Sequence, residues 1–193
     1  NDIAVGGASK ASGGQSVAVG LMSQATGLRS IAVGESAKAA DIDAVAFGRG
    51  SEANALSSTA VGDRAKANGT QAVALASAAE ANGYQAVAVG TRAVAEETNS
   101  VALGVESSST ALNGLAAGTR ARVRKSGGTA LGAGAAAFEE KSAALGYKAE
   151  ARQQNSVALG TDSVADTAAG VAGHDFATGA ASTETGKAWV STL

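Results

Sequence analysis

Few side chains in this 193-residue chain have the types and spacing that catalysis requires. His174 is the only histidine, so a histidine-based triad would depend on this single residue. It stands where most copies of a repeated pattern have glycine, which favours a turn or capping role. The chain contains no cysteine, so thiolate catalysis, disulfides and cysteine metal sites are excluded.

Three short patterns suggest ligand sites, and each lacks part of the chemistry it would need. Thr185-Gly186-Lys187 is similar to the end of a phosphate-binding loop, but Ala181 and Ala188 replace the first glycine and the final Ser/Thr. Gly132-Ala133-Gly134 is not followed by a helical pattern, as a dinucleotide site requires. Asp41-Ile42-Asp43 lacks the remaining oxygen ligands of a calcium loop. We therefore expect no catalytic, cofactor-binding or metal-binding residues, no cofactor and no enzyme.

One local cluster of basic residues could bind a ligand. It consists of Arg120, Arg122, Arg124 and Lys125. Such a belt could attract sulfated glycans or anionic matrix, although a solvated charged face remains the simpler alternative. The formal net charge of −2 gives no overall basic field, so no nucleic-acid partner is expected.

A fourteen-residue pattern determines where all these side chains lie. It occurs thirteen times without insertion or deletion, from Ile3-Ala4-Val5-Gly6 to a last copy that begins at Val171. The second residue is always alanine, and the fourth is glycine except at Ala76 and His174. A strict short period predicts a stack of similar supersecondary units, each contacting its neighbours.

Each copy contains two short alternating stretches, which predict two strands. In the second copy, Val17 and Val19 are expected to face inward and Ala18 outward, while Ser23 and Ala25 face inward from the second strand. Two strands and two turns in fourteen residues make a flattened, two-sided coil. The sequence therefore predicts an all-β parallel β-roll solenoid of about thirteen coils, a rod roughly 60 Å long. By the same pattern, Phe47 faces inward and needs a small partner.

The outward residues predict which sheet is covered by a partner. On the second strand many outward residues are charged, whereas on the first strand the outward residue is always alanine. A continuous apolar stripe of this length is typical of an interface, so we expect self-association there, with a tolerated surface stripe on a monomer as the alternative. The interface residues predicted in this way are Ala18, Ala32, Ala46, Ala60, Ala74, Ala88, Ala102, Ala116, Ala130, Ala144 and Ala158.

The repeated pattern also resembles that of a known family. Asn99-Ser100-Val101-Ala102-Leu103-Gly104 and the segments 155–160, 16–20 and 85–90 resemble the head repeat of trimeric autotransporter adhesins, the YadA-like heads of Gram-negative surface fibres. The resemblance covers about nine-tenths of the chain. It implies a left-handed roll, a homotrimer around one axis and display at the outer membrane. The handedness and the number three come from the resemblance alone.

The resemblance also implies a function and a domain arrangement. Residues 1–174 are expected to form the head, and residues 175–193 a cap or the start of the next connector module. The head would attach a Gram-negative bacterium to host cells, extracellular matrix proteins or surface glycans by multivalent binding, as a virulence factor exported by type V secretion. Because the chain starts within a repeat, we expect it to be part of a larger exported protein with its membrane anchor elsewhere.

Two other functions fit a rod of this kind. A structural spacer would hold a distal binding domain away from the cell surface. An ice-binding solenoid would need a flat array of threonines at one repeat position, whereas the outward residues expected here are alanine on one face and mixed charges on the other.

Overall fold

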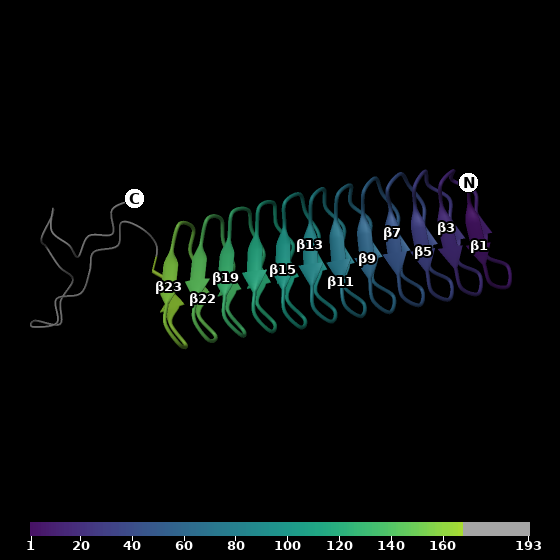
Figure 1. Ribbon diagram of the computed structural model, residues 1–193. Coiled ribbons are helices and arrows are strands. Elements are labelled where there is room, and N and C mark those ends of the chain that lie inside the picture. The colour runs from purple at the N-terminus through teal and green to yellow at the C-terminus, as the bar shows by residue number, and fades with distance from the viewer. Residues whose placement is uncertain (168–193) are drawn as a thin grey trace, which may run out of the picture.

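The chain forms a straight solenoid of stacked coils (Figure 1). The computed structural model describes residues 1–167, in which two 12-stranded parallel sheets are built from twelve coils. There is no helix in this part of the chain. The predicted all-β parallel solenoid of fourteen-residue coils is therefore confirmed for twelve copies. The last copy and the predicted boundary at residue 174 lie outside the described residues.

Each coil contributes one strand to each sheet. Sheet A contains the three-residue strands β1 (Ile3–Val5), β3 (Val17–Val19), β5 (Ile31–Val33), β7 (Val45–Phe47), β9 (Thr59–Val61), β11 (Val73–Leu75), β13 (Val87–Val89), β15 (Val101–Leu103), β17 (Leu115–Ala117), β19 (Thr129–Leu131), β21 (Ala143–Leu145) and β23 (Val157–Leu159). Sheet B contains the two-residue strands β2 (Lys10–Ala11), β4 (Gln24–Ala25), β6 (Lys38–Ala39), β8 (Glu52–Ala53), β10 (Lys66–Ala67), β12 (Glu80–Ala81), β14 (Val94–Ala95), β16 (Ser108–Ser109), β18 (Arg122–Val123), β20 (Ala136–Ala137), β22 (Glu150–Ala151) and β24 (Val164–Ala165).

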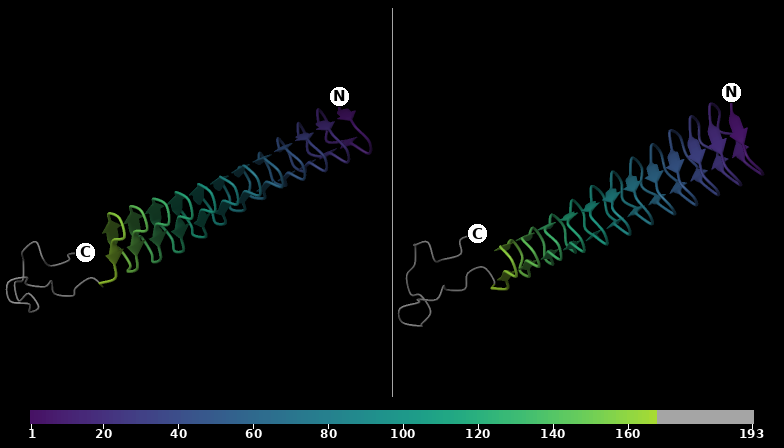
Figure 2. Two further views of the ribbon diagram at one scale, coloured as in Figure 1. Left: turned by 90° about the horizontal axis from the view of Figure 1, so that it is seen from below. Right: turned by 60° about the horizontal axis from the view of Figure 1, so that its bottom comes forward.

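Hydrogen bonds run along the rod and join equivalent residues of successive coils. Strand β3 pairs with β5 so that Ala18 lies opposite Ala32, and every other pair keeps this fourteen-residue register. Consecutive strands in the chain therefore lie in different sheets, which follow the two sides of the rod (Figure 2). Each coil lies about 4.8 Å from the next, the usual spacing between paired strands.

The interior is lined by the smallest side chains. Ser16 and Ala18 from the sheet A side, and Ser23 and Ala25 from the sheet B side, have no exposed surface. Equivalent alanines and serines fill the other coils. The prediction that Ser23 and Ala25 face inward is confirmed.

The predicted direction of the first strand is wrong. Ala18 faces inward, and the flanking Val17 and Val19 lie on the outer surface of sheet A. Phe47 likewise lies outside, with 54% of its surface exposed. The physical reason is the narrowness of the coil: the inward positions of both strands are filled by methyl and hydroxymethyl groups, which leaves no room for a valine pair.

One coil shows how little spare volume the interior has. Val123 is the one large hydrophobic residue that is fully buried among residues 1–167. Its Cγ1 lies 3.0 Å from the place where a Cβ on Gly114 would lie and 2.7 Å from that of Gly128. Other coils have serine or alanine at the two glycine positions, so the extra volume of Val123 is accommodated by removing two neighbouring Cβ atoms.

The glycine that follows each sheet A strand is required by the close stacking of coils. Gly34 has φ of 133°, and a Cβ there would lie 2.5 Å from the carbonyl oxygen of Gly48 in the next coil. Ala76 occupies this position in its own coil with φ of 106°, a conformation that side chains other than glycine rarely adopt.

Buried serines complete the turns. The Ser23 hydroxyl donates to the carbonyl of Gly20 at 3.0 Å, and Ser58 donates to the carbonyl of Ala55 at 2.6 Å. Because a buried hydroxyl without a partner is costly, this bond explains how serine can share interior positions with alanine. Ser30, Ser100 and Ser109 are exceptions, since their buried hydroxyl oxygens have no partner among the described residues.

Candidate functional site

The two outer faces of the rod have opposite chemical character. On sheet A, the first and third residues of every strand point outward, and all of them except Thr59 and Thr129 are apolar. Eight of them are substantially exposed, from 38% for Leu103 to 74% for Leu159, and the others are half-buried. A continuous exposed stripe of valine, isoleucine and leucine along a whole rod is a strong indication of an interaction surface.

The outer face of sheet B is polar and mixed in charge. Its outward residues include Lys38, Glu52, Lys66 and Glu80, which lie on four successive strands in register. Opposite charges on neighbouring strands favour the pairing and keep the surface hydrated. The sequence-based expectation that this sheet faces water is thus consistent with the positions of its side chains.

The alanines predicted as the subunit interface are inside the coil. Ten of them have no exposed surface in a single chain, namely Ala18, Ala32, Ala46, Ala60, Ala74, Ala88, Ala102, Ala116, Ala130 and Ala144, and Ala158 is 3% exposed. A partner chain cannot contact methyl groups that are already enclosed. The candidate interface therefore shifts to the residues on either side of each alanine, on the same sheet.

The predicted basic belt is divided across sheet B. Arg122 lies on β18, Arg120 in the turn before this strand, and Arg124 and Lys125 in the turn after it. Arg124 places its guanidinium 4.8 Å from the centre of the Phe138 ring, a cation–π contact. The four residues thus span the width of the sheet and do not converge on one point.

Arg120 belongs to an ion-pair chain across three coils. Its Nε donates to Glu106 at 2.8 Å, and Arg92 donates to the other oxygen of the same carboxylate. The hydrogen bond from Arg120, together with the charges of both guanidinium groups, lowers the pKa of Glu106 below its ordinary value. These side chains are exposed, so the pairs fix orientation more than they stabilise the fold.

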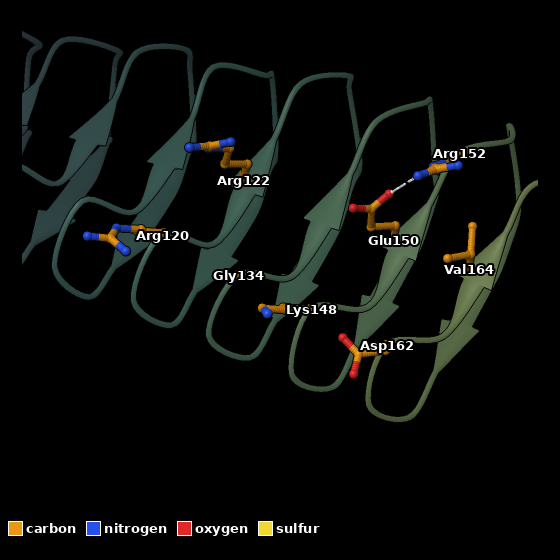
Figure 3. A pocket seen from close by; sticks show the side chains of 8 residues that line it. All are labelled: Arg120, Arg122, Gly134, Lys148, Glu150, Arg152, Asp162 and Val164. Atoms are coloured by element: carbon orange, nitrogen blue, oxygen red, sulfur yellow. Dashed lines mark hydrogen bonds and ion pairs between the residues drawn. The ribbon is translucent and has the colours of Figure 1, made fainter.

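A shallow groove of about 430 Å³ opens on sheet B beside Arg122 (Figure 3). We call it the Ala136 groove, because the outward residue of the coil between Arg122 and Glu150 is Ala136. Arg120 and Arg122 lie on one side of it, and Lys148, Glu150 and Arg152 on the other, with Gly134 between Arg120 and Lys148. Asp162 and Val164 of the following coil complete the lining. Four positive side chains and the two carboxylates of Glu150 and Asp162 meet in this groove.

A family model described as the YadA head domain repeat (2 copies) matches residues 1–21, 25–51, 53–75, 81–107, 95–121, 124–149, 139–163 and 151–172. The chain belongs to the YadA head domain family. These matches cover most of its length, and their boundaries follow the repeat. No curated protein matches the chain.

Membership of the YadA head family gives the repeat a biological setting. The family comprises heads of trimeric autotransporter adhesins, which are exposed at the cell surface, and it is not a family of enzymes. Residues 1–167 contain no group of three or more acidic or histidine side chains that could hold a metal ion. In the same residues there is also no helix long and apolar enough to cross a membrane.

The remaining sequence candidates are placed only in part. Asp43 is engaged by Arg29, whose Nε and terminal nitrogen both donate to it at 2.6 Å, so Asp41 and Asp43 do not form a cation site together. His174 and Lys187 lie outside the described part of the YadA head chain.

Sequence reasoning missed Lys148 and Arg152 as partners of Arg122. They are 26 and 30 residues away in the chain, yet the fourteen-residue period places them on the second coil after Arg122. The signal lies in the repeat itself: Gly134 and Ala136 have no long side chains, and basic residues stand fourteen positions before and after this coil.

Proposed function

We propose that this chain is the adhesive head of a bacterial surface protein, acting as a homotrimer that attaches Gram-negative cells to host cells or extracellular matrix. The observation that carries the proposal is the contrast between the outer faces: sheet A is apolar along its whole length, and sheet B is charged. Family membership supports the same proposal, because the family is that of trimeric adhesin heads.

The interface of the trimer would be the outer face of sheet A. Three chains around one axis would place the three apolar stripes together and leave the three charged sheets in contact with water. Val87 and Val89, flanking the enclosed Ala88, illustrate the residues that would be buried. The equivalent side chains along the rod add up to a long interface in which each coil contributes a small area.

Ligand binding would then use sheet B and the turns. Every exposed feature of one chain occurs three times around a trimer, and similar coils follow one another along the rod. Weak contacts that repeat in this way give high avidity when the ligand is itself repetitive, as matrix fibres are. Export by type V secretion, an outer-membrane anchor outside this segment and a role in virulence are parts of the same proposal.

The direct experiment is a binding assay with the intact chain on immobilised collagen, fibronectin and laminin. The test variant exchanges the signs of four charges on sheet B, with Lys38→Glu, Lys66→Glu, Glu52→Lys and Glu80→Lys. It keeps the net charge and sheet A unchanged. We expect saturable binding of the wild type to at least one matrix protein and weaker binding of the variant.

A spacer is the second candidate function, since a regular rod also holds another domain at a distance. It predicts that neither protein binds matrix and that cells keep their attachment when this segment is deleted from the surface protein. That pair of results would exclude the adhesive head.

A further inference from the structure

The Ala136 groove arises from a local break in the repeat. The residue two positions after the sheet A glycine is Arg120 in one coil, Gly134 in the next and Lys148 in the third. On the adjacent row of sheet B, the outward residues of the same coils are Arg122, Ala136 and Glu150. The middle coil therefore has no long side chain in either row, while both neighbours do.

The floor of the groove is recessed between its walls. Gly134 is the residue of the middle coil that lines the groove. Ala136 points outward from β20 between Arg122 and Glu150, and it is only 6% exposed because the longer side chains of the neighbouring coils stand on either side of it. The two walls are separated by two coil spacings, roughly 10 Å. A groove of this width is open along its length and suits a thin linear chain.

Two of the four positive side chains have no ion-pair partner within the described residues. Arg120 is paired with Glu106, and Arg152 donates to Glu150 at 2.8 Å, as the dashed line in Figure 3 shows. Arg122 and Lys148 lie on opposite walls and form no such pair in residues 1–167. The Lys148 ammonium lies 5.0 Å from the centre of the exposed Tyr147 ring, a cation–π contact that leaves its charge unneutralised. Both positive charges therefore remain available to an anion between the walls.

The chemistry of the groove selects among anionic polymers. Arginine binds planar or tetrahedral oxyanions through several N–H groups, and lysine adds a second positive charge. The lining contains no aromatic ring on which a nucleic-acid base could stack.

We propose that the Ala136 groove binds a sulfated polysaccharide, with Arg122 and Lys148 contacting sulfate groups from opposite walls and Gly134 and Ala136 leaving room for the sugar ring. This inference rests on the proposed function and specifies one ligand class for it. It differs from the predicted belt, because Arg124 and Lys125 do not line the groove, whereas Lys148 and Arg152 do.

The test measures the affinity of the intact chain for heparin and for chemically desulfated heparin. The double variant Arg122→Glu/Lys148→Glu is expected to weaken heparin binding by about tenfold or more, the effect of losing two charge-assisted contacts. The matched control is Lys10→Glu/Lys141→Glu, which makes the same charge change outside the groove, next to uncharged residues of the neighbouring coils, and should bind nearly as wild type. Desulfated heparin should bind weakly to all three proteins.

A second variant tests the shape of the groove without altering its charge. Ala136→Gln introduces a long uncharged side chain between the two walls. The fold should tolerate it, because Gln24 occupies the same repeat position on β4. We expect folded protein, verified by circular dichroism, with reduced heparin affinity. Wild-type heparin affinity in both groove variants, or an equal loss in the Lys10/Lys141 control, would overturn the proposal.

The outcomes also separate this inference from the proposed function. If the chain binds matrix proteins and the groove variants bind heparin as tightly as wild type, the groove proposal is contradicted and the proposed function is not. Groove-dependent heparin binding without any attachment to matrix proteins would support the groove and contradict matrix attachment.

Discussion

Ala18 and Val19 are neighbours on strand β3 and lie on opposite sides of sheet A: the methyl group of Ala18 is enclosed in the coil, and the Val19 side chain lies on the outer surface. The alanine is likewise buried in every later strand of sheet A from β5 to β23, whereas Ala4 in the terminal strand β1 is exposed. This arrangement means that one chain completes its own narrow interior with alanine and serine, and that the larger apolar side chains remain available to a partner.

The packing around Val123 predicts a coupled pair of substitutions. Gly128→Ala alone should destabilise the fold by about 1–3 kcal/mol, since the new Cβ would lie 2.7 Å from Val123 Cγ1. Val123→Ala alone should cost about 1 kcal/mol through the cavity it leaves. The double variant restores the alanine content of other coils and should be more stable than the two separate losses imply. Urea unfolding of all four proteins gives the coupling energy, and strict additivity would contradict this packing.

Two serines at the same repeat position should respond in opposite ways to replacement by alanine. The Ser58 hydroxyl donates to the Ala55 carbonyl at 2.6 Å, so Ser58→Ala should destabilise by about 1 kcal/mol. The Ser30 hydroxyl is buried without a partner in the described chain, so Ser30→Ala should stabilise by about 1 kcal/mol. Thermal unfolding of the pair tests this directly. Equal shifts of the same sign would show that the hydrogen bond does not distinguish them.

At the position that follows each sheet A strand, replacing alanine by glycine and replacing glycine by alanine should change the free energy of unfolding in opposite directions. Ala76→Gly relieves the unfavourable φ of 106° and should stabilise by about 1 kcal/mol after the entropy of the added glycine is subtracted. Gly34→Ala should destabilise by about 2 kcal/mol or more, because its Cβ would meet the Gly48 carbonyl oxygen at 2.5 Å. A stable Gly34→Ala protein would refute the requirement for glycine.

The ion-pair chain through Glu106 predicts a pH dependence with a definite sign. Its folded-state pKa is lowered by the hydrogen bond from Arg120 and by the charges of Arg92 and Arg120. A lowered carboxyl pKa contributes stability above the unfolded-state pKa, near the ordinary value of 4.5, and this contribution is lost as the pH falls through the folded-state pKa. Wild type should therefore melt above Glu106→Gln at pH 7, and the two should converge in acid. Added salt should reduce the difference at neutral pH. A difference that persists in strong acid would show that the charge is not its source.

Much of the architecture follows from the repeat itself. The invariant fourteen-residue spacing requires equivalent coils, and the glycine after Val19 and its counterparts marks the end of each sheet A strand. The outward position of Gln24 and the inward positions of Ser23 and Ala25 were also predictable, because charged residues recur at the first position and small residues at the other two.

The direction of the sheet A strand was not predictable from alternation alone. A period of two shows that Val17 and Ala18 face opposite sides, but it does not show which side is inside. The deciding feature is how much the residue type varies among the repeats. The position of Ala18 is alanine in every repeat, whereas the position of Val17 is Ile, Thr, Leu or Ala in other repeats. A closed, narrow space requires one size of side chain, and an outer surface accepts many.

The central claim is that the outer face of sheet A is buried between identical chains. The most direct measurement is light scattering of the intact chain at micromolar concentration, with Val87→Glu/Val89→Glu compared to the control Lys10→Glu/Lys141→Glu, which changes charge away from sheet A. We predict three times the mass of one chain for wild type and control, and dissociation for the Val87/Val89 variant. A well-folded wild-type monomer at this concentration would contradict the account.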